Sequence, residues 1–247
     1  MSIHQRRQGA GLLCRRGIRL ASWLVDSPDA SELRAARGQL VSYGARLLAD
    51  GLAAGSAGNI SVRLGDVVAI TPSGIGYQAM APADICIVTL DGAELDAAEE
   101  PSSETPMHLA IYAATDAAAV VHTHSPEVIA LSTACDELPA IHYAITGLGG
   151  PVRVASYARF GSAGLASAAT MGLDGRRAVI LQNHGAVTYG RTLADAYDRA
   201  LLLEWLAGIY RIARSYGAPR ILSAAQLDEV TAETERRRYG LRRRQAE

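Results

Sequence analysis

Two histidines one residue apart end an apolar, valine-rich stretch near the middle of the chain, Ala118-Ala-Val-Val-His-Thr-His-Ser125. If this stretch is a β-strand, its side chains alternate between two faces, so His122 and His124 point the same way. Two neighbouring imidazoles supply half of the ligands that a zinc or similar metal site needs. The alternative is that one histidine ends the strand and the other is an ordinary surface residue. The pair therefore raises the hypothesis of a metal site that other residues must complete.

Further candidate ligands lie on both sides of this pair. His184 also follows an apolar run, Ala178-Val-Ile-Leu181, and comes immediately before a glycine. Together with Glu104, at an expected helix start, three strand-end histidines supply the three or four ligands of an open catalytic zinc site. His108 lies among apolar neighbours in the helix expected to follow Glu104, and we interpret it as a packing residue and not a ligand.

Three turns of small and polar residues are candidates for binding an anion: Gly58-Asn59, Ser73-Gly74 and Ser102-Ser103. Each combines small side chains with backbone N–H donors, and the third lies at an expected helix N-terminus. One such turn carries little weight, because serine and glycine populate ordinary turns. Convergence of the three beside one metal would indicate a site for a phosphate group.

The chain contains no lysine, and all 24 of its basic residues are arginines. A side-chain amine is needed for Schiff-base catalysis, and the Walker-type phosphate loop also depends on a lysine. Carbonyl or carbanion chemistry would therefore need another electrophile here. A metal ion is the evident candidate.

Composition restricts the class of protein. At 247 residues, 49% of them hydrophobic, the chain is long enough for one large domain with its own core. A formal net charge of -1 gives no global attraction to nucleic acid or a membrane. The cysteines Cys14, Cys86 and Cys135 are widely spaced and form no CxxC pair, which favours a reducing, cytoplasmic location.

Hydrophobic periodicity and turn residues divide the chain into short strands and helices. Helices are expected over residues 31–50, 126–134, 161–171 and 192–216, and from 223; a further helix is opened by residues 101–106, with Pro106 in its first turn. Strands are expected over residues 60–63, 67–71, 85–90, 118–124, 141–143, 151–155, 178–181 and 186–188. We therefore predict a single α/β domain over residues 31–247. The arginine-rich segment 1–30 is expected to be a disordered extension, to which we assign no function.

Seven short motifs follow one another along the chain. They are Gly55-Ser-Ala-Gly-Asn-Ile-Ser61, Thr71-Pro-Ser-Gly74, Pro101-Ser-Ser-Glu104, His122-Thr-His124, Ile141-His-Tyr143, Tyr157-Ala-Arg-Phe-Gly161 and Asn183-His-Gly185. With the terminal Tyr239-Gly-Leu-Arg242 they resemble the class II aldolase/adducin family, most closely its L-fuculose-1-phosphate aldolase branch. The resemblance implies an α/β fold in which a central, mainly antiparallel β-sheet is flanked by helices.

The resemblance also implies a metal site and a phosphate site. One zinc ion (Zn²⁺) per subunit is expected to bind His122, His124 and His184, with Glu104 as the fourth ligand; Mn²⁺ or Co²⁺ are alternatives. The residues expected to hold a substrate phosphate are Asn59, Ser73, Gly74, Ser102 and Ser103.

In this family the metal binds the hydroxyl and carbonyl oxygens of dihydroxyacetone phosphate. The resemblance implies roles for four residues of this chain. Glu104 leaves the metal and moves a proton as general base. Tyr143 of a neighbouring subunit exchanges a proton with the aldehyde-derived oxygen, Tyr239 on a mobile C-terminal tail closes over the site, and Phe160 contacts the aldehyde. We therefore expect a homotetramer with sites at subunit interfaces. By residue type alone, Tyr143 and Phe160 would be packing residues and Tyr239 part of a solvated basic tail.

The implied activity is reversible cleavage of a ketose 1-phosphate, either L-fuculose 1-phosphate or a 5-deoxy- or 5-methylthio-pentulose 1-phosphate. The products are dihydroxyacetone phosphate and an aldehyde, so the protein would be an aldehyde-lyase. Cleavage leaves an enediolate, whose charge a zinc Lewis acid stabilises. Thr105 stands where the fuculose enzymes carry a bulky aromatic residue, which leaves the aldehyde undetermined.

Other functions stay open at this point. Within the same fold, an L-ribulose-5-phosphate 4-epimerase or a methylthioribulose-1-phosphate dehydratase is the nearest alternative. A non-catalytic adducin-type interaction module need not keep a metal site, and all four candidate ligands are present here. A His-x-His pair is also found in cupins, but those are nearly all-β, and this chain has at least four helical segments.

Overall fold

The computed structural model describes residues 28–237, which are built around one nine-stranded sheet. Its strand order is β4-β3-β2-β1-β5-β9-β8-β7-β6, and every neighbouring pair is antiparallel except β7 and β8. The described strands are β1 (Asn59–Leu64), β2 (Val67–Ile70), β3 (Cys86–Thr89), β4 (Glu94–Asp96), β5 (Ala119–Thr123), β6 (Glu137–Leu138), β7 (Val152–Ala155), β8 (Ala178–Leu181) and β9 (Gly185–Gly190). Most of the predicted N-terminal extension, and Tyr239, lie outside the described residues.

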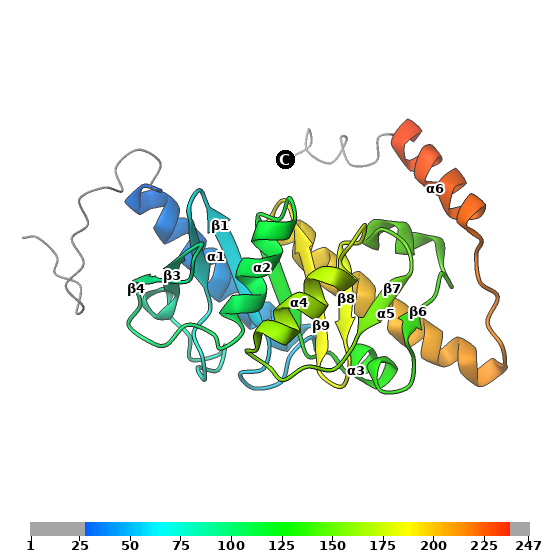
Figure 1. Ribbon diagram of the computed structural model, residues 1–247, viewed down its shortest axis with the longest axis horizontal. Helices are drawn as coiled ribbons and strands as arrows, with labels where there is room; N and C mark the ends of the chain where they lie inside the picture. Colours follow the sequence, from blue (N-terminus) through cyan, green and yellow to red (C-terminus); the bar gives the residue numbers. More distant parts are fainter. Residues whose placement is uncertain (1–27, 238–247) are drawn as a thin grey trace, which may run out of the picture.

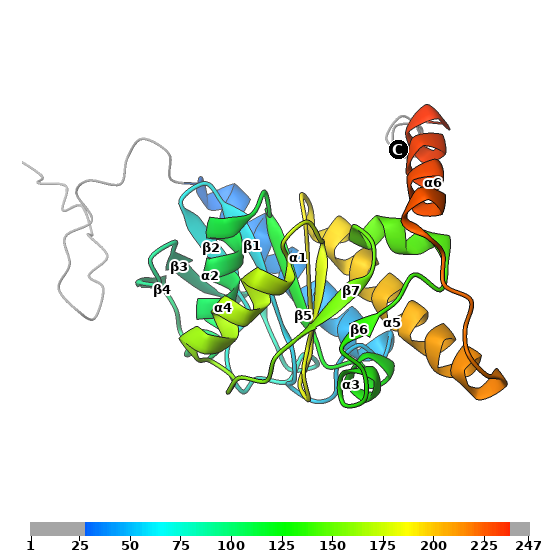
Figure 2. The same ribbon diagram turned by 45° about the vertical axis from the view of Figure 1, so that its right-hand side comes forward.

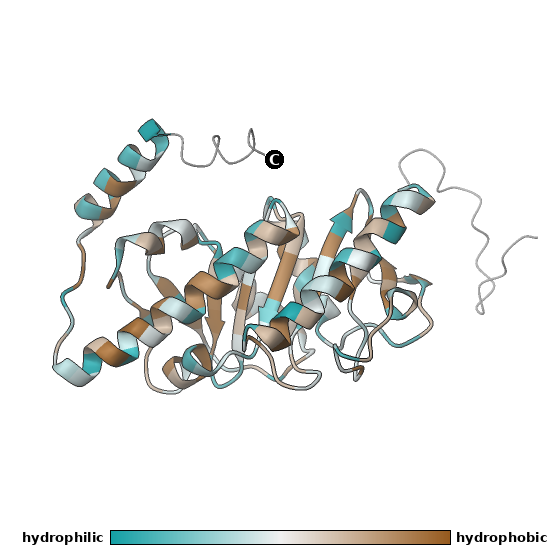
Figure 3. Cartoon of the chain, turned by 180° about the vertical axis from the view of Figure 1, so that it is seen from behind, coloured by the Kyte–Doolittle hydropathy of each residue, from teal (hydrophilic) through white to brown (hydrophobic). Residues whose placement is uncertain are grey.

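Helices cover both faces of the sheet. In Figure 1, α2 (Thr105–Ala114) and α4 (Ala163–Gly172) lie in front of it. Seen from behind in Figure 3, α1 (Ala30–Ala49) and α5 (Leu193–Tyr216) cross the opposite face, and α3 (Pro126–Ser132) packs beside α5. The predicted α/β architecture, a mainly antiparallel sheet flanked by helices, is confirmed.

Burial on two faces explains why the central strands are apolar along their whole length. In β5, Val120 packs with α2 and α4, whereas Ala119 and Val121 pack with the core under α1 and α5. By the same alternation, His122 and His124 share the face of Val120, toward the start of α2. The sheet therefore delivers both imidazoles to one side of its central strand.

Local hydrogen bonds define the ends of several helices. Asp29 accepts from the backbone N–H groups of Ser31 and Glu32 at the start of α1, at 2.7 and 2.8 Å. The predicted capping box at Ser223 is confirmed, because its N–H donates to Gln226 Oε1 (2.8 Å) and its hydroxyl accepts from the Gln226 N–H (3.3 Å). The helix that follows, α6 (Ala224–Arg237), stands away from the sheet in Figure 2 and has no buried residue.

One predicted element is wrong. Residues 141–143 were expected to form a strand, but His142 instead caps the 3-10 helix η2 (Tyr143–Leu148). Its Nδ1 accepts the Ala144 N–H at 3.1 Å, and this local bond competes with strand pairing. The short strands β4 and β6 were not expected, because two or three residues give too little alternation to detect. Within residues 28–237, no helix is long and apolar enough to cross a membrane.

The close contact between β5 and β9 requires a residue without a side chain at Gly185. A Cβ atom there would lie 2.1 Å from the carbonyl oxygen of Thr123. We expect Gly185→Ala to push the strands apart and to lower the free energy of unfolding by about 1–3 kcal/mol. Gly38→Ala is the control, because open space surrounds that position in α1 and a stabilisation of up to ~1 kcal/mol is expected. Urea unfolding measures both, and equal effects would contradict the prediction.

Candidate metal centre

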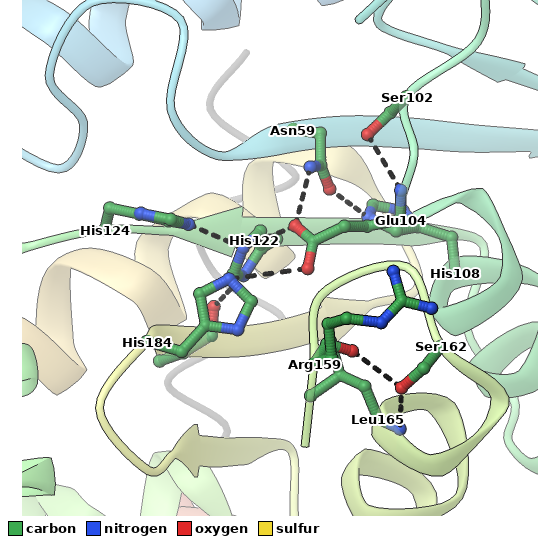
Figure 4. A network of polar contacts seen from close by, with 11 residues as sticks. Asn59, Ser102, Glu104, His108, His122, His124, Arg159, Ser162, Leu165 and His184 are labelled. Carbon is green, nitrogen blue, oxygen red and sulfur yellow. Dashed lines mark hydrogen bonds and ion pairs between the residues drawn. The ribbon is translucent and has the colours of Figure 1, made fainter. Parts of the chain in front are cut away.

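Four side chains from distant parts of the chain meet at one end of the central strands. Potential ligand atoms of Glu104, His122, His124 and His184 all lie within 4.8 Å of one another. Figure 4 shows the three imidazoles grouped against the carboxylate. The two histidines near the end of β5 do point the same way, with ring centroids 4.7 Å apart. Glu104 immediately precedes α2, and His184 lies in the turn between β8 and β9.

Backbone contacts fix the orientation of His122. Its ring is fully buried, and its Nδ1 lies 2.9 Å from the carbonyl oxygen of Ala186 on the neighbouring strand β9. Because a carbonyl oxygen only accepts, Nδ1 carries a proton and Nε2 is turned toward the site. Nε2 lies 2.8 Å from Glu104 Oε2 and 2.9 Å from His124 Nε2. Such a carbonyl contact is the usual way in which a protein orients a metal-binding imidazole.

Electrostatics in this cluster favour a bound cation. Glu104 is 5% exposed, and its Oε1 has no hydrogen-bond partner among the described residues, although His184 Nε2 lies 3.4 Å away. Burial raises the pKa of Glu104, but the charge of His122 and its hydrogen bond outweigh that effect and lower the pKa below its ordinary value. Unpaired buried charge is unfavourable, so a carboxylate surrounded by ring nitrogens needs a positive partner. The orphaned oxygen thus fits a metal ligand.

The remaining histidines are held neutral, as metal ligands must be. Burial, with a smaller effect from the charge of His122, lowers the pKa of His124 to about 3. The same two causes lower the pKa of His184. One carboxylate and three imidazoles form a donor set suited to Zn²⁺ and related transition metals.

A pocket of about 340 Å³ opens beside the cluster. Glu104, His124 and His184 form one side of it. All six residues predicted from the sequence to contact substrate also line this pocket: Asn59, Ser73, Gly74, Ser102, Ser103 and Phe160. A larger hollow of about 740 Å³ also reaches Ser102 but is lined by none of the four clustered groups.

Pairing of two loops brings the hydroxyl groups together. The Ser73 N–H donates to the Glu100 carbonyl at 2.8 Å, and the Ser102 N–H donates to the Thr71 carbonyl at 3.2 Å. These bonds hold residues 71–74 against residues 100–103, directly before the N-terminus of α2. An anion in the pocket would therefore meet serine hydroxyls and the positive end of a helix dipole.

Two predicted residues are not brought to this pocket within the chain. Tyr143 begins η2, is 57% exposed and stacks on His142 with ring centroids 4.4 Å apart. Tyr239 lies outside the described residues. Sequence reasoning missed Tyr157 and Asn183, which also line the pocket. Asn183 has a φ of 55°, and a polar Asn-His-Gly turn between two apolar strands was the available signal.

Comparison with known proteins agrees with this geometry. The family model for the class II aldolase and adducin N-terminal domain matches residues 38–211. The chain belongs to the class II aldolase and adducin family. The predicted resemblance is therefore confirmed, and the matched span contains all four clustered groups.

Individual members of the family resemble the chain over most of their length. A 5-deoxy-D-ribulose 1-phosphate aldolase from Bacillus thuringiensis serovar kurstaki is 38% identical over 206 residues, which cover 82% of this chain and 97% of that relative. A 5-methylthioribulose-1-phosphate/5-deoxyribulose-1-phosphate aldolase from Rhodospirillum rubrum is 40% identical over 182 residues, covering 73% and 82%. A solved structure of an L-fuculose 1-phosphate aldolase superposes with a TM-score of 0.79 at 34% identity, covering 81% of this chain and 96% of that one.

Acidification should destabilise the metal-free protein before most carboxylates titrate. Burial lowers the pKa of His108 and of His124 from 6.5 to about 3 in the folded chain. Below about pH 6.5 the unfolded chain therefore binds protons that the folded chain excludes, and stability falls toward pH 3. Each histidine contributes up to about 1.4 kcal/mol per pH unit in this window.

Urea unfolding at pH 8, 7, 6 and 5, with a chelator present, measures this dependence. The free energy of unfolding should be flat above pH 7 and fall below it. His124→Gln should make the fall in the free energy of unfolding with decreasing pH less steep. The variant lacks one of the imidazoles that bind a proton only in the unfolded chain. A stability that does not change from pH 8 to pH 5 would contradict the neutral, buried state of these rings.

Proposed function

We propose that this protein is a metal-dependent aldolase that reversibly cleaves a ketose 1-phosphate to dihydroxyacetone phosphate and an aldehyde. The proposal rests above all on the group of Glu104, His122, His124 and His184, the first two of them buried, beside a hydroxyl-lined pocket. The relatives named as 5-deoxyribulose- and 5-methylthioribulose-1-phosphate aldolases support a 5-deoxy- or 5-methylthio-pentulose 1-phosphate as substrate. L-Fuculose 1-phosphate is the other candidate, supported by the solved structure of that name.

In this proposal the three histidines and Glu104 hold one divalent ion, with zinc favoured by three imidazoles and a carboxylate. The bound ion would supply a Lewis acid for the oxygens of the ketose. Since the chain has no lysine, no side-chain amine can take that electrophilic role. The free Cys86 and Cys135 thiols agree with a reducing, cytoplasmic setting.

The substrate phosphate would lie against Ser73, Gly74, Ser102 and Ser103, with the Asn59 amide beside them. The chain has no lysine to neutralise the phosphate charge. Hydroxyl groups, backbone amides and the N-terminus of α2 would therefore bind the phosphate. These groups recognise a phosphate by hydrogen-bond geometry. The carbons next to the phosphate would then lie toward Glu104.

Glu104 is the proposed general base. Its pKa is lowered beside His122, so the group is a carboxylate at neutral pH and can accept a proton from the substrate. Phe160 is 59% exposed where it borders the pocket, which suits contact with the aldehyde portion. Tyr143 and Tyr239, from another subunit, would exchange a proton with the aldehyde oxygen and close the site.

Activity and metal content test the proposal together. The purified protein should contain about one divalent ion per chain and release dihydroxyacetone phosphate from 5-deoxyribulose, 5-methylthioribulose or fuculose 1-phosphate. Glu104→Gln should lower kcat by about 10²–10⁴ through loss of the base. Glu127→Gln is the matched control, because that glutamate pairs with Arg211 at the surface, 2.6 Å away.

The other outcomes separate the alternatives. Consumption of a ketose phosphate without triose phosphate would indicate the epimerase or dehydratase reaction of the same fold. A protein that binds no divalent ion and has no activity after one is added would be an adducin-type interaction module. Either result overturns the aldolase proposal.

The position of Tyr143 leads us to propose a homotetramer with its active sites at subunit interfaces. Tyr143 and His142 form an exposed aromatic cluster with Trp205, which is 50% exposed and whose ring centroid lies 5.0 Å from that of His142. Exposed aromatic clusters are typical of interfaces.

Mixed oligomers test this arrangement. His122→Ala and Tyr143→Phe should each be nearly inactive alone. After unfolding and refolding together in equal amounts, about a quarter of the sites in a cyclic tetramer would combine an intact histidine with an intact tyrosine. Coupled detection of dihydroxyacetone phosphate should then show recovered activity. Mixed oligomers without recovery would exclude shared sites.

A further inference from the structure

A line of buried polar side chains runs from Glu104 into the core between the sheet and α2. Asn59 Nδ2 lies 3.1 Å from Glu104 Oε2, and Asn59 Oδ1 lies 2.6 Å from His108 Nε2. On its other side, His108 Nδ1 lies 2.7 Å from Ser61 Oγ, which in turn lies 2.7 Å from the Tyr112 hydroxyl. Figure 4 shows the part of this line from the carboxylate to His108.

The carboxylate sets the direction of every hydrogen bond in the line. Ionised Glu104 only accepts, so Asn59 must present its NH₂ group to it and its carbonyl oxygen to His108. That oxygen also only accepts, so His108 carries its proton on Nε2. Nδ1 of His108 then accepts from the Ser61 hydroxyl, which accepts in turn from Tyr112. One arrangement of protons therefore gives each of the four hydrogen bonds in the line one donor and one acceptor.

Burial makes this arrangement costly to break. Ser61 and His108 are fully buried, Tyr112 is 2% exposed and Asn59 is 5% exposed, so water cannot readily replace a missing partner. Without the donor on His108 Nε2, the Asn59 oxygen would lose its partner, and the amide could turn its oxygen toward the carboxylate. The carboxylate would then lose a donor and face a repulsive group.

We propose that His108 is a positioning residue for the reaction, which through Asn59 orients the Glu104 carboxylate and keeps the Asn59 N–H group directed into the pocket. The inference rests on the proposed function for its kinetic consequence, but not for its structural one. When Glu104 accepts a proton, Asn59 stays anchored by His108 and still offers a donor to the substrate. His108, interpreted from the sequence as a packing residue, thus has a second role in the same buried position.

A pair of polar substitutions separates positioning from packing. The amide nitrogen of Gln in His108→Gln can reach the place of Nε2 and donate to Asn59, whereas the shorter side chain in His108→Asn reaches only the place of Nδ1. We expect His108→Asn to lower zinc affinity and kcat each by about 10–100-fold, the usual effect of losing a group that orients a ligand. His108→Gln should keep both within a few-fold, and KM should change less than kcat.

The control is Ile111→Ala, which removes fully buried apolar packing three residues along the same helix, at a side chain that takes part in none of the hydrogen bonds of the line. It should lower the unfolding midpoint while zinc affinity, measured by chelator competition, stays unchanged. If Ile111→Ala lowers zinc affinity as much as His108→Asn, or if the Gln and Asn variants behave alike, His108 is only a packing residue. Zinc affinity is measured without substrate, so an inactive wild-type protein overturns the aldolase proposal without affecting this test.

The wild-type protein provides a test that does not depend on the folding of any variant. Long-range ¹H–¹⁵N correlation spectra of the zinc-loaded, ¹⁵N-histidine-labelled protein distinguish the two imidazole tautomers. The His108 signal, assigned directly in the wild-type protein, should belong to a neutral ring protonated at Nε2. A ring protonated at Nδ1, or at both nitrogens at neutral pH, would overturn the proposed direction of the line.

Discussion

A buried carboxylate in contact with imidazole nitrogens is the constraint on which the rest of the site depends. Charge removed from water is unfavourable unless strong partners surround it, and Glu104 is nearly fully buried. Asn59 supplies one donor at 3.1 Å, and three histidines approach from the other side. The carboxylate therefore belongs to two groups of side chains at once: the candidate metal ligands on one side and the polar line on the other. The strands and loops around it hold these partners at fixed distances.

The central sheet holds the partners of Glu104 in position. His122 pairs with Asn59 across β1 and β5, so the strand register alone places an imidazole beside the amide that contacts Glu104. On the other side, β9 provides the Ala186 carbonyl that orients His122. Because both faces of these strands are covered by helices, their backbones have little freedom to shift. Side chains held by a central strand are positioned more rigidly than side chains on a loop.

Much of this arrangement could be predicted from the sequence, for identifiable physical reasons. Strand alternation correctly predicted that His122 and His124 share a face, because a period of two is independent of tertiary context. The motifs likewise indicated the family. The strand expected at residues 141–143 failed because a single hydrogen bond from the Ala144 N–H to His142 redirects the backbone, and such local competition leaves no periodic signal. The role of His108 was also hidden, since its partners Asn59 and Ser61 lie on a strand almost fifty residues away in sequence.

The pocket is built from two kinds of structure, and this difference bears on substrate choice. Its inner part comes from the sheet, the start of α2 and the paired loops, where Asn59, Ser102 and Glu104 are buried. Its outer part comes from the segment between β7 and α4, where Tyr157 and Phe160 are 66% and 59% exposed. Exposed loop side chains can change with little effect on the core. In the proposed aldolase, the buried part would keep one reaction at the phosphate-bearing end of a ketose while the loop would accommodate different aldehydes, which agrees with relatives whose names specify different sugars.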